Sequence, residues 1–178
     1  KAPQGVLALL RMQRKRLAEV LAEGASCFLA VESLQDPGNL GTMLRAGEGA
    51  GLSAILANRG TVDIYNPKVI RATMGSIFRV PVVYVDDFRE ALLTLAREGI
   101  CLYAAALQAS VPYDSIEYPE KTAFLIGNEA AGLSEEAITA ANQSIHIPML
   151  GQVESLNAAV AASVLLYERA RQRRRETK

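Results

Sequence analysis

The chain has few of the residues that most metal and disulfide sites need. Its 178 residues include two cysteines, one histidine and no tryptophan. Cys27 and Cys101 lie in separate apolar runs without CxxC spacing, which argues against zinc or a disulfide framework and favours buried thiols in a reducing compartment. One histidine is too few for histidine triads or multi-histidine metal sites. Because His146 stands between two isoleucines, a hydrogen-bonded strand histidine is the simpler interpretation.

An excess of one charge and long apolar runs are also missing. The 19 basic and 19 acidic residues cancel, so any basic surface must come from local clusters. No apolar run approaches the roughly 20 residues of a membrane span, and no signal-peptide pattern is present. We therefore expect a cytoplasmic protein with no membrane partner and no metal.

What is present is typical of one α/β domain. Half of the residues are hydrophobic and 21% are charged, which suits a chain with a sizeable buried core. Strand-like apolar runs cover residues 27–31, 53–57, 80–85, 100–106, 121–126 and 144–147. Helical patterns cover residues 40–50, 67 to about 75, 87–98, a segment after Ser134 and a segment after Ser155. This alternation predicts a mostly parallel sheet with helices on both faces.

Both ends of the chain carry basic clusters. Residues 1–24 are expected to form a linker and an amphipathic helix, with basic residues at 11, 14, 15 and 16. The last helix is expected to bury one stripe and then to turn basic beyond Tyr167. The stripe comprises Leu156, Ala159, Val160, Ser163, Val164 and Tyr167. For the first cluster the alternatives are a solvated surface or contact with RNA phosphates, and for the second a solvated, dipole-compensating helix end or an RNA surface.

The glycine pattern excludes the common nucleotide sites. The turn after the first strand, residues 32–38, contains neither GxGxxG nor GxxxxGK[ST], which disfavours a nucleotide-dependent oxidoreductase. Gly47 and Gly49 fall inside a helical pattern, where each costs roughly 1 kcal/mol relative to alanine unless close packing is needed there.

Polar residues gather at three junctions between strands, loops and helices, two of them within Phe124–Asn157. The six are Asn39, Arg45, Asn128, Glu129, Ser155 and Asn157. Singly, each has a structural alternative, such as a helix cap for Asn39 or Ser155 and a surface charge near Glu48 for Arg45. Because loops that follow parallel strands meet at one sheet edge, together they predict a site for a polar, phosphate-bearing substrate.

Three motifs resemble those of the SpoU/TrmH (SPOUT) family of RNA 2′-O-ribose methyltransferases. They are Asn39-x-Gly41-x-x-x-Arg45, Ile126-Gly127-Asn128-Glu129 with Gly132-Leu133, and Ile147-Pro148-Met149-x-Gly151-x-Val153-Glu154-Ser155-Leu156-Asn157. The resemblance spans about residues 27–167, in the family's order and spacing. One departure is Ala130, which stands where the second motif usually has a glycine.

The resemblance implies a deep trefoil knot over about residues 124–160, which the general rule that chains do not knot would have rejected. It implies S-adenosylmethionine as cofactor, held largely by backbone groups, and a homodimer whose site is completed near the subunit interface. The cofactor-binding positions are Leu107, Ile126, Gly127, Ile147, Met149 and Leu156. The catalytic positions are Arg45, with Asn39, Glu129, Ser155 and Asn157 orienting it or the substrate.

The implied activity is 2′-O-methylation of a ribose in RNA, with 23S-type ribosomal RNA favoured over transfer RNA. A non-catalytic RNA-binding module of the same fold is the alternative. Pro3–Ala8 resembles a link that follows an N-terminal RNA-binding domain in many members. We therefore expect residues 1–24 to be a linker and helix after such a domain, and residues 25–178 to be the catalytic domain.

Overall fold

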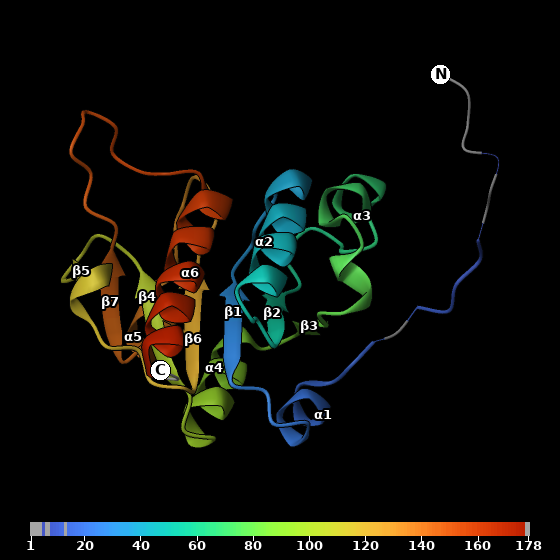
Figure 1. Cartoon of the computed structure of the whole chain (residues 1–178), viewed down its shortest axis with the longest axis horizontal. Helices are drawn as coiled ribbons and strands as arrows, with labels where there is room; N and C mark the ends of the chain where they lie inside the picture. Colours follow the sequence, from blue (N-terminus) through green and yellow to red (C-terminus); the bar gives the residue numbers. More distant parts are fainter. Residues whose placement is uncertain (1–4, 6–7, 13, 177–178) are drawn as a thin grey trace.

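The protein is built on a seven-stranded sheet in the order β3-β2-β1-β6-β4-β7-β5 (Figure 1). The computed structural model describes residue 5, residues 8–12 and residues 14–176. The strands are β1 Cys27–Val31, β2 Ala54–Asn58, β3 Val82–Val85, β4 Cys101–Ala105, β5 Val111–Pro112, β6 Thr122–Ile126 and β7 Gln143–His146. All pairings between these strands are parallel. The predicted parallel sheet is confirmed; β5 was not predicted because two residues carry no periodic signal.

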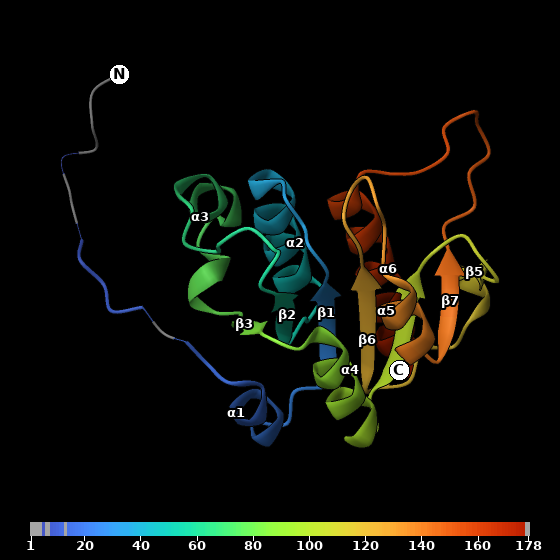
Figure 2. The same ribbon diagram turned by 180° about the vertical axis from the view of Figure 1, so that it is seen from behind.

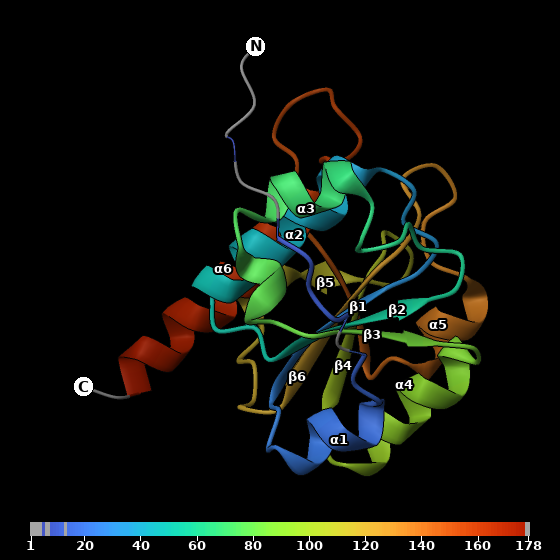
Figure 3. The ribbon, with the colours of Figure 1, turned by 90° about the vertical axis from the view of Figure 1, so that its right-hand side faces the viewer.

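Helices cover both faces of the sheet, as predicted (Figure 3). They are α1 Leu17–Ala22, α2 Pro37–Gly49, α3 Pro67–Thr73, α4 Phe88–Arg97, α5 Glu135–Ala140 and α6 Ala158–Glu176, with short 3₁₀ turns η1 Ser76–Phe78 and η2 Tyr113–Ser115. Leu29 of β1 belongs to the core cluster that includes residues of α2 and α6. Phe28, on the opposite face of β1, packs in the cluster that includes α4 residues. A strand buried on both faces explains why residues 27–31 are apolar without alternation.

Helix α6 buries a different stripe from the one the sequence predicted. Its buried residues are Ala159, Ala162, Leu165, Leu166 and Arg169, whereas Val160 and Tyr167 are 47% and 46% exposed. Leu156 precedes the helix. The first turns of α6 are small or apolar all round, so periodicity alone misplaced the buried face by about one residue. Arg169, expected in a solvated basic end, instead donates a hydrogen bond to the Glu120 carbonyl.

Several smaller expectations are also resolved. His146 is hydrogen-bonded, with Nδ1 2.8 Å from Ser110 Oγ. Cys27 is buried, but Cys101 is only half-buried, so its predicted burial is wrong in part. A Cβ on Gly47 would lie 2.5 Å from Leu52 Cδ2, so close packing explains that helical glycine. Among the described residues, no helix combines the length and apolar character of a membrane span.

Candidate active site

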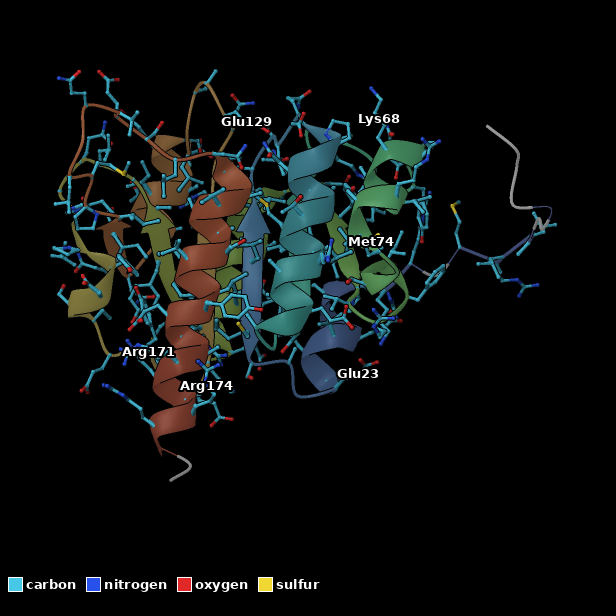
Figure 4. All side chains as sticks on the ribbon, turned by 45° about the horizontal axis from the view of Figure 1, so that its top comes forward. Glu23, Lys68, Met74, Glu129, Arg171 and Arg174 are labelled. Carbon is cyan, nitrogen blue, oxygen red and sulfur yellow. The ribbon has the colours of Figure 1, made fainter. Side chains whose placement is uncertain are left out.

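Three loops meet at the carboxyl edge of the sheet. They follow β1, β6 and β7, whose arrows point the same way in Figure 2, and they lead into α2, α5 and α6. Figure 4 labels Glu129 at this edge, above the sheet. This is the edge at which open parallel sheets bind their ligands.

The Glu129 carboxylate holds the loop between β1 and α2. Oε2 accepts a hydrogen bond from the Gln35 backbone N–H at 3.2 Å. Oε1 accepts one from the Asp36 backbone N–H at 3.1 Å and one from Asn39 Nδ2 at 3.0 Å. Burial alone raises the pKa of this carboxyl, but the hydrogen bonds from Asn39, Gln35 and Asp36 outweigh it and hold the pKa below its usual value. Glu129 is therefore an ionised acceptor whose oxygens are already engaged.

Asn39 connects that carboxylate to the last helix. Asn39 is 8% exposed, and its Oδ1 accepts from Asn157 Nδ2 at 2.9 Å. Asn157 Oδ1 in turn accepts from the backbone N–H of Ala159 and Val160, which caps α6. A single chain of hydrogen bonds, Glu129 to Asn39 to Asn157, thus ties all three loops together. We call it the loop-joining network.

Neither Asn39 nor Ser155 caps a helix, so the helix-cap alternative is wrong for both residues. Asp36 caps α2, because its side chain accepts from the Asn39 backbone N–H at 2.7 Å and Pro37 takes the first helical position. Asn157, rather than Ser155, caps α6. The Asp-Pro pair was the available sequence signal for the first of these, and it also explains why α2 starts before residue 40.

The loop after β6 folds tightly on itself. Asn128 and Gly132 exchange backbone hydrogen bonds of 3.0 and 2.9 Å, and Asn128 Oδ1 accepts from the backbone N–H of Ala130 and Ala131. Gly132 has a φ of 72°, whereas Ala130 is absent from the residues with positive φ. The alanine in place of the usual motif glycine therefore imposes no backbone strain. Gly127 is different, because a Cβ there would lie 2.0 Å from the Gly132 carbonyl carbon.

Substitutions at Gly127 and Ala130 test whether the close approach of Gly127 to Gly132, rather than any change of residue in this loop, determines the stability of the fold. Gly127→Ala is expected to lower the free energy of unfolding by about 1–3 kcal/mol, because the added methyl overlaps the backbone of Gly132. Ala130→Gly is the matched control and should cost no more than about 1 kcal/mol, chiefly through the unfolded chain. Urea unfolding of both variants measures the difference. Equal losses would contradict the close approach at Gly127.

Two predicted catalytic residues lie outside the network. Arg45 is exposed on α2, and within the described part of the chain no hydrogen bond or ion pair reaches it. It is six residues beyond Asn39, about 9 Å along the helix axis. This exposure agrees with the alternative of a surface charge near Glu48, although Glu48 itself pairs with Arg79. Ser155 is exposed in the loop before α6, and no hydrogen bond to it occurs among the described residues.

The predicted cofactor positions follow three adjacent strands. These strands are β6, β4 and β7 in sheet order. Ile126 is the last residue of β6 and Gly127 follows it, Leu107 follows β4, and Ile147 and Met149 follow β7. Ile126 and Gly127 are buried, Ile147, Met149 and Leu156 are half-buried, and Leu107 is 67% exposed. Between Pro148 and Leu156, in the region described, no backbone group makes an internal hydrogen bond. These groups are free to bind a ligand, which fits a cofactor held by backbone N–H and C=O groups.

One hydrogen-bonded contact at this edge was not predicted from the sequence. Glu32 accepts hydrogen bonds of 2.8 Å from both the backbone N–H and the hydroxyl of Ser134, and so joins the end of β1 to the start of α5. No sequence signal marked it, because a carboxylate in a turn is common. The predicted cap of α5 is confirmed, since Ser134 Oγ accepts from the Ala137 N–H at 3.2 Å.

The basic end of α6 lies far from these loops. Arg171 and Arg174 are at the opposite end of the molecule from Glu129 (Figure 4). Arg171 pairs with Glu168 at 2.6 Å, and Arg173 donates to the Tyr118 carbonyl. Much of this cluster is therefore structural. Across the described residues, no three or more His, Cys, Asp or Glu side chains group to hold a metal ion.

The fold and this edge define an α/β protein with a candidate ligand site in the loops after its parallel strands. The chain belongs to the SpoU rRNA Methylase family, whose model matches residues 26–167.

Relatives and solved structures agree with this family. The chain is 39% identical over 173 residues to the Bacillus subtilis 23S rRNA (guanosine(2553)-2′-O)-methyltransferase RlmP, covering 94% of this chain and 65% of the relative. It is 31% identical to the 23S rRNA (uridine(2479)-2′-O)-methyltransferase of Streptomyces viridochromogenes, covering 97% of this chain and 62% of the relative. The crystal structure of the SpoU methyltransferase AviRb from that organism, in complex with AdoMet, matches with a TM-score of 0.83 and 30% identity over 92% of this chain and 67% of that one. The chain thus spans less than two thirds of these two relatives.

Proposed function

We propose that this chain is the catalytic domain of an S-adenosylmethionine-dependent methyltransferase that modifies a ribose 2′-hydroxyl in 23S-type ribosomal RNA. The observation that carries the proposal is the loop-joining network, which brings the side chains of Glu129, Asn39 and Asn157, one from each motif, to one edge of the sheet. The names of the relatives support ribosomal RNA over transfer RNA.

The backbone of the loops after β6, β4 and β7 is the proposed cofactor site. Gly127 leaves room where a side chain would overlap Gly132, and Pro148–Leu156 offers unpaired backbone groups. Ile126, Ile147, Met149 and Leu156 would supply apolar surface, with Leu107 at the rim. When bound, the cofactor supplies a methyl group on a sulfonium, which is already activated for transfer.

The remaining task of the protein is to align the ribose hydroxyl and help remove its proton. Glu129 and Asn39 act as positioning residues, because their side-chain polar atoms are occupied by one another, by Asn157 and by loop backbone. Arg45 and Ser155 have free donors and are the proposed substrate contacts. A guanidinium stays protonated at neutral pH, so Arg45 serves as a two-pronged clamp on the phosphate beside the target ribose while a neighbouring group or water takes the proton.

A trefoil knot is part of the proposal. After β7 the chain forms the long loop 147–157, which runs back across the sheet. Helix α6 then packs against α2 and against β6, which lies two strands from β7 in the sheet order. The loop after β6 lies at the edge where this return takes place. That path supports a chain end threaded through an earlier loop.

A homodimer with shared sites is also proposed. α2 and α6 lie side by side on one face of the sheet (Figure 1), and that face carries the exposed apolar side chains Val160 and Tyr167. Arg45 is exposed on α2, away from the network of its own chain. A second copy on this face would cover the apolar residues and receive Arg45 near its own site.

The N-terminal part of the chain is proposed to be a linker. Helix α1 lies in this part of the chain and buries Val20, while Arg14 and Arg16 are exposed. The link-like segment Pro3–Ala8 lies largely outside the described residues. We propose residues 1–24 as the connection to an RNA-binding domain and residues 25–178 as the catalytic domain.

Calorimetry and methyl transfer together test the function. The chain is expected to bind S-adenosylmethionine and to transfer a labelled methyl group to 23S rRNA transcripts but not to transfer RNA, with the product resistant to alkaline cleavage at one nucleotide. Mapping 2′-O-methyl sites in RNA from a deletion strain locates that nucleotide. RNA binding without cofactor binding would contradict the enzyme and favour a non-catalytic RNA-binding module.

A further inference from the structure

A hollow of about 710 Å³ lies beside the edge strand β3. Its walls are residues 14–17 before and at the start of α1, the strand β3, and residues 77–81 in and after η1. None of the motif residues lines it. In Figures 1 and 2 helix α1 lies at this side of the sheet. We call this hollow the β3-edge groove.

The lining of the groove is basic and aromatic. Five basic side chains face two acidic ones, with three aromatic rings among them. They are Arg14, Lys15, Arg16, Arg59 and Arg79; Asp63 and Asp86; and Tyr65, Phe78 and Tyr84. Tyr84 is part of the frame, because its hydroxyl donates to the Val62 carbonyl and accepts from the Ile64 N–H. Phe78 is 70% exposed, so its ring is available to a ligand.

The cations of the groove are accessible although most are paired. Arg59 contacts Asp86 at 2.6 Å, with its side chain 63% exposed, and Arg79 pairs with Glu48 with its side chain 57% exposed. Outside the lining, Glu19 pairs with Arg16 and Glu23 with Lys15. Exposed pairs of this kind contribute little and leave guanidinium N–H groups free. Arg14 is exposed, and among the described residues it has no partner.

One wall of the groove is hydrogen-bonded to a loop of the candidate active site. Residues 59–65, several of which line it, form the loop after β2. That loop is bonded to the loop after β1, since the Val62 N–H donates to the Leu34 carbonyl at 2.9 Å and Gln35 Nε2 donates to the Gly60 carbonyl. The backbone N–H of Gln35 is also the one that Glu129 binds. A polymer lying in the groove would therefore pass along a loop that is bonded directly to the proposed catalytic loops.

From these observations we propose that the β3-edge groove binds a single-stranded segment of the substrate RNA next to the methylated nucleotide. Its phosphates contact Arg59 and Arg79, and one base stacks on Phe78, the combination used for single-stranded nucleic acids. An extended peptide paired to the β3 edge is the competing occupant, but it gives no reason for the exposed guanidinium groups of Arg59 and Arg79 beside the exposed ring of Phe78. The inference rests on the proposed function in that the bound polymer is the substrate of the same site.

Fluorescence anisotropy with a labelled single-stranded U12 RNA tests the groove on the full chain. Arg59→Ala is expected to weaken binding about fivefold and to reduce the slope of log affinity against log salt by about 0.7. Phe78→Leu is expected to weaken binding about tenfold with an unchanged slope, and Phe78→Tyr should restore it. Arg97→Ala is the matched control, because Arg97 is 64% exposed and paired with Glu90, like Arg59 with Asp86, but lies on α4.

The outcomes distinguish this inference from the proposed function. If the wild type methylates rRNA and the groove variants bind U12 as it does, the groove belongs to another partner, such as a peptide, and the inference is overturned while the function stands. Equal losses in Arg59→Ala and Arg97→Ala overturn it in the same way. Groove-dependent U12 binding without methyl transfer to any RNA supports the groove and overturns the enzyme. The groove variants should retain cofactor affinity by calorimetry, which shows that the fold is intact.

Discussion

Arg45→Ala is expected to lower kcat for ribose methylation by about 10²–10⁴-fold while leaving the affinity for S-adenosylmethionine within about twofold. The rate should fall because the proposed clamp on the substrate phosphate is lost. The cofactor affinity should hold because Arg45 is exposed and without a partner in the described part of the chain, so it supports neither the fold nor the loops proposed for the cofactor. Arg89→Ala is the control, because Arg89 is also an exposed helix arginine but lies on α4. Single-turnover rates and calorimetry measure the two effects separately.

Arg45→Lys decides between a clamp and a simple positive charge. A lysine keeps the charge but loses the planar fork that binds two phosphate oxygens, so we expect it to remain at least about tenfold slower than arginine across the pH range. A near-normal rate with lysine would make the fork unnecessary. A rate that falls steeply at low pH only in the arginine enzyme would point to a proton-transfer role for Arg45.

Mixing two inactive variants tests whether Arg45 acts across a dimer. Arg45→Ala and Asn39→Ala remove different parts of the proposed site. If each site takes Arg45 from one copy and the network from the other, random re-pairing of equal amounts should restore about a quarter of the wild-type activity, because each mixed dimer holds one intact site. If both residues act within one copy, the mixed dimers also hold no intact site and activity stays at the level of the single variants.

The sequence alone was sufficient to predict a parallel sheet covered by helices on both faces and to predict where most of the helices begin. Buried parallel strands give continuous apolar runs, as in β1, and Asn66-Pro67 and Ser134 are local cap signals that the structure confirms, since Asn66 accepts from the Lys68 N–H and Ser134 from the Ala137 N–H. Such features depend on neighbours in sequence. They are therefore visible without tertiary information.

The contacts of the site could not be derived in the same way. Asn39 and Asn157 are 118 residues apart, and their hydrogen bond exists only because the chain after β7 returns across the sheet and packs α6 beside α2. Motif resemblance marked these residues as groups that orient Arg45 or the substrate, but it did not indicate that Asn39 bonds directly to both Glu129 and Asn157. The buried face of α6 depended on packing against α2 and β6, which the helix pattern by itself does not encode.

Glu129→Gln is expected to lower kcat about 100-fold, the size of effect that a shift of the catalytic groups by about 1 Å can produce. A carboxylate accepts all three hydrogen bonds from Gln35, Asp36 and Asn39, whereas a glutamine must turn its NH₂ group toward at least one N–H donor. The loop after β1 would then move relative to α6. Single-turnover kinetics at saturating cofactor measures the loss, and an unchanged rate would show that the network does not position the site.

The same variant gives a stability difference that depends on pH in a defined direction. The cost of Glu129→Gln should be about 1 kcal/mol at pH 7, at the lower end for charged hydrogen bonds because Glu129 is exposed. Since the folded-state pKa is lowered, the stabilisation by the carboxylate is fully present above the unfolded value of about 4.3 and is lost as pH falls through the folded value. Urea unfolding at pH 7, 5, 4 and 3 should therefore show wild type and variant converging only at the acid end. Glu117→Gln, in the exposed segment after η2, is the control. Convergence already between pH 7 and 5 would mean that the hydrogen bonds to Glu129 do not favour its ionised form.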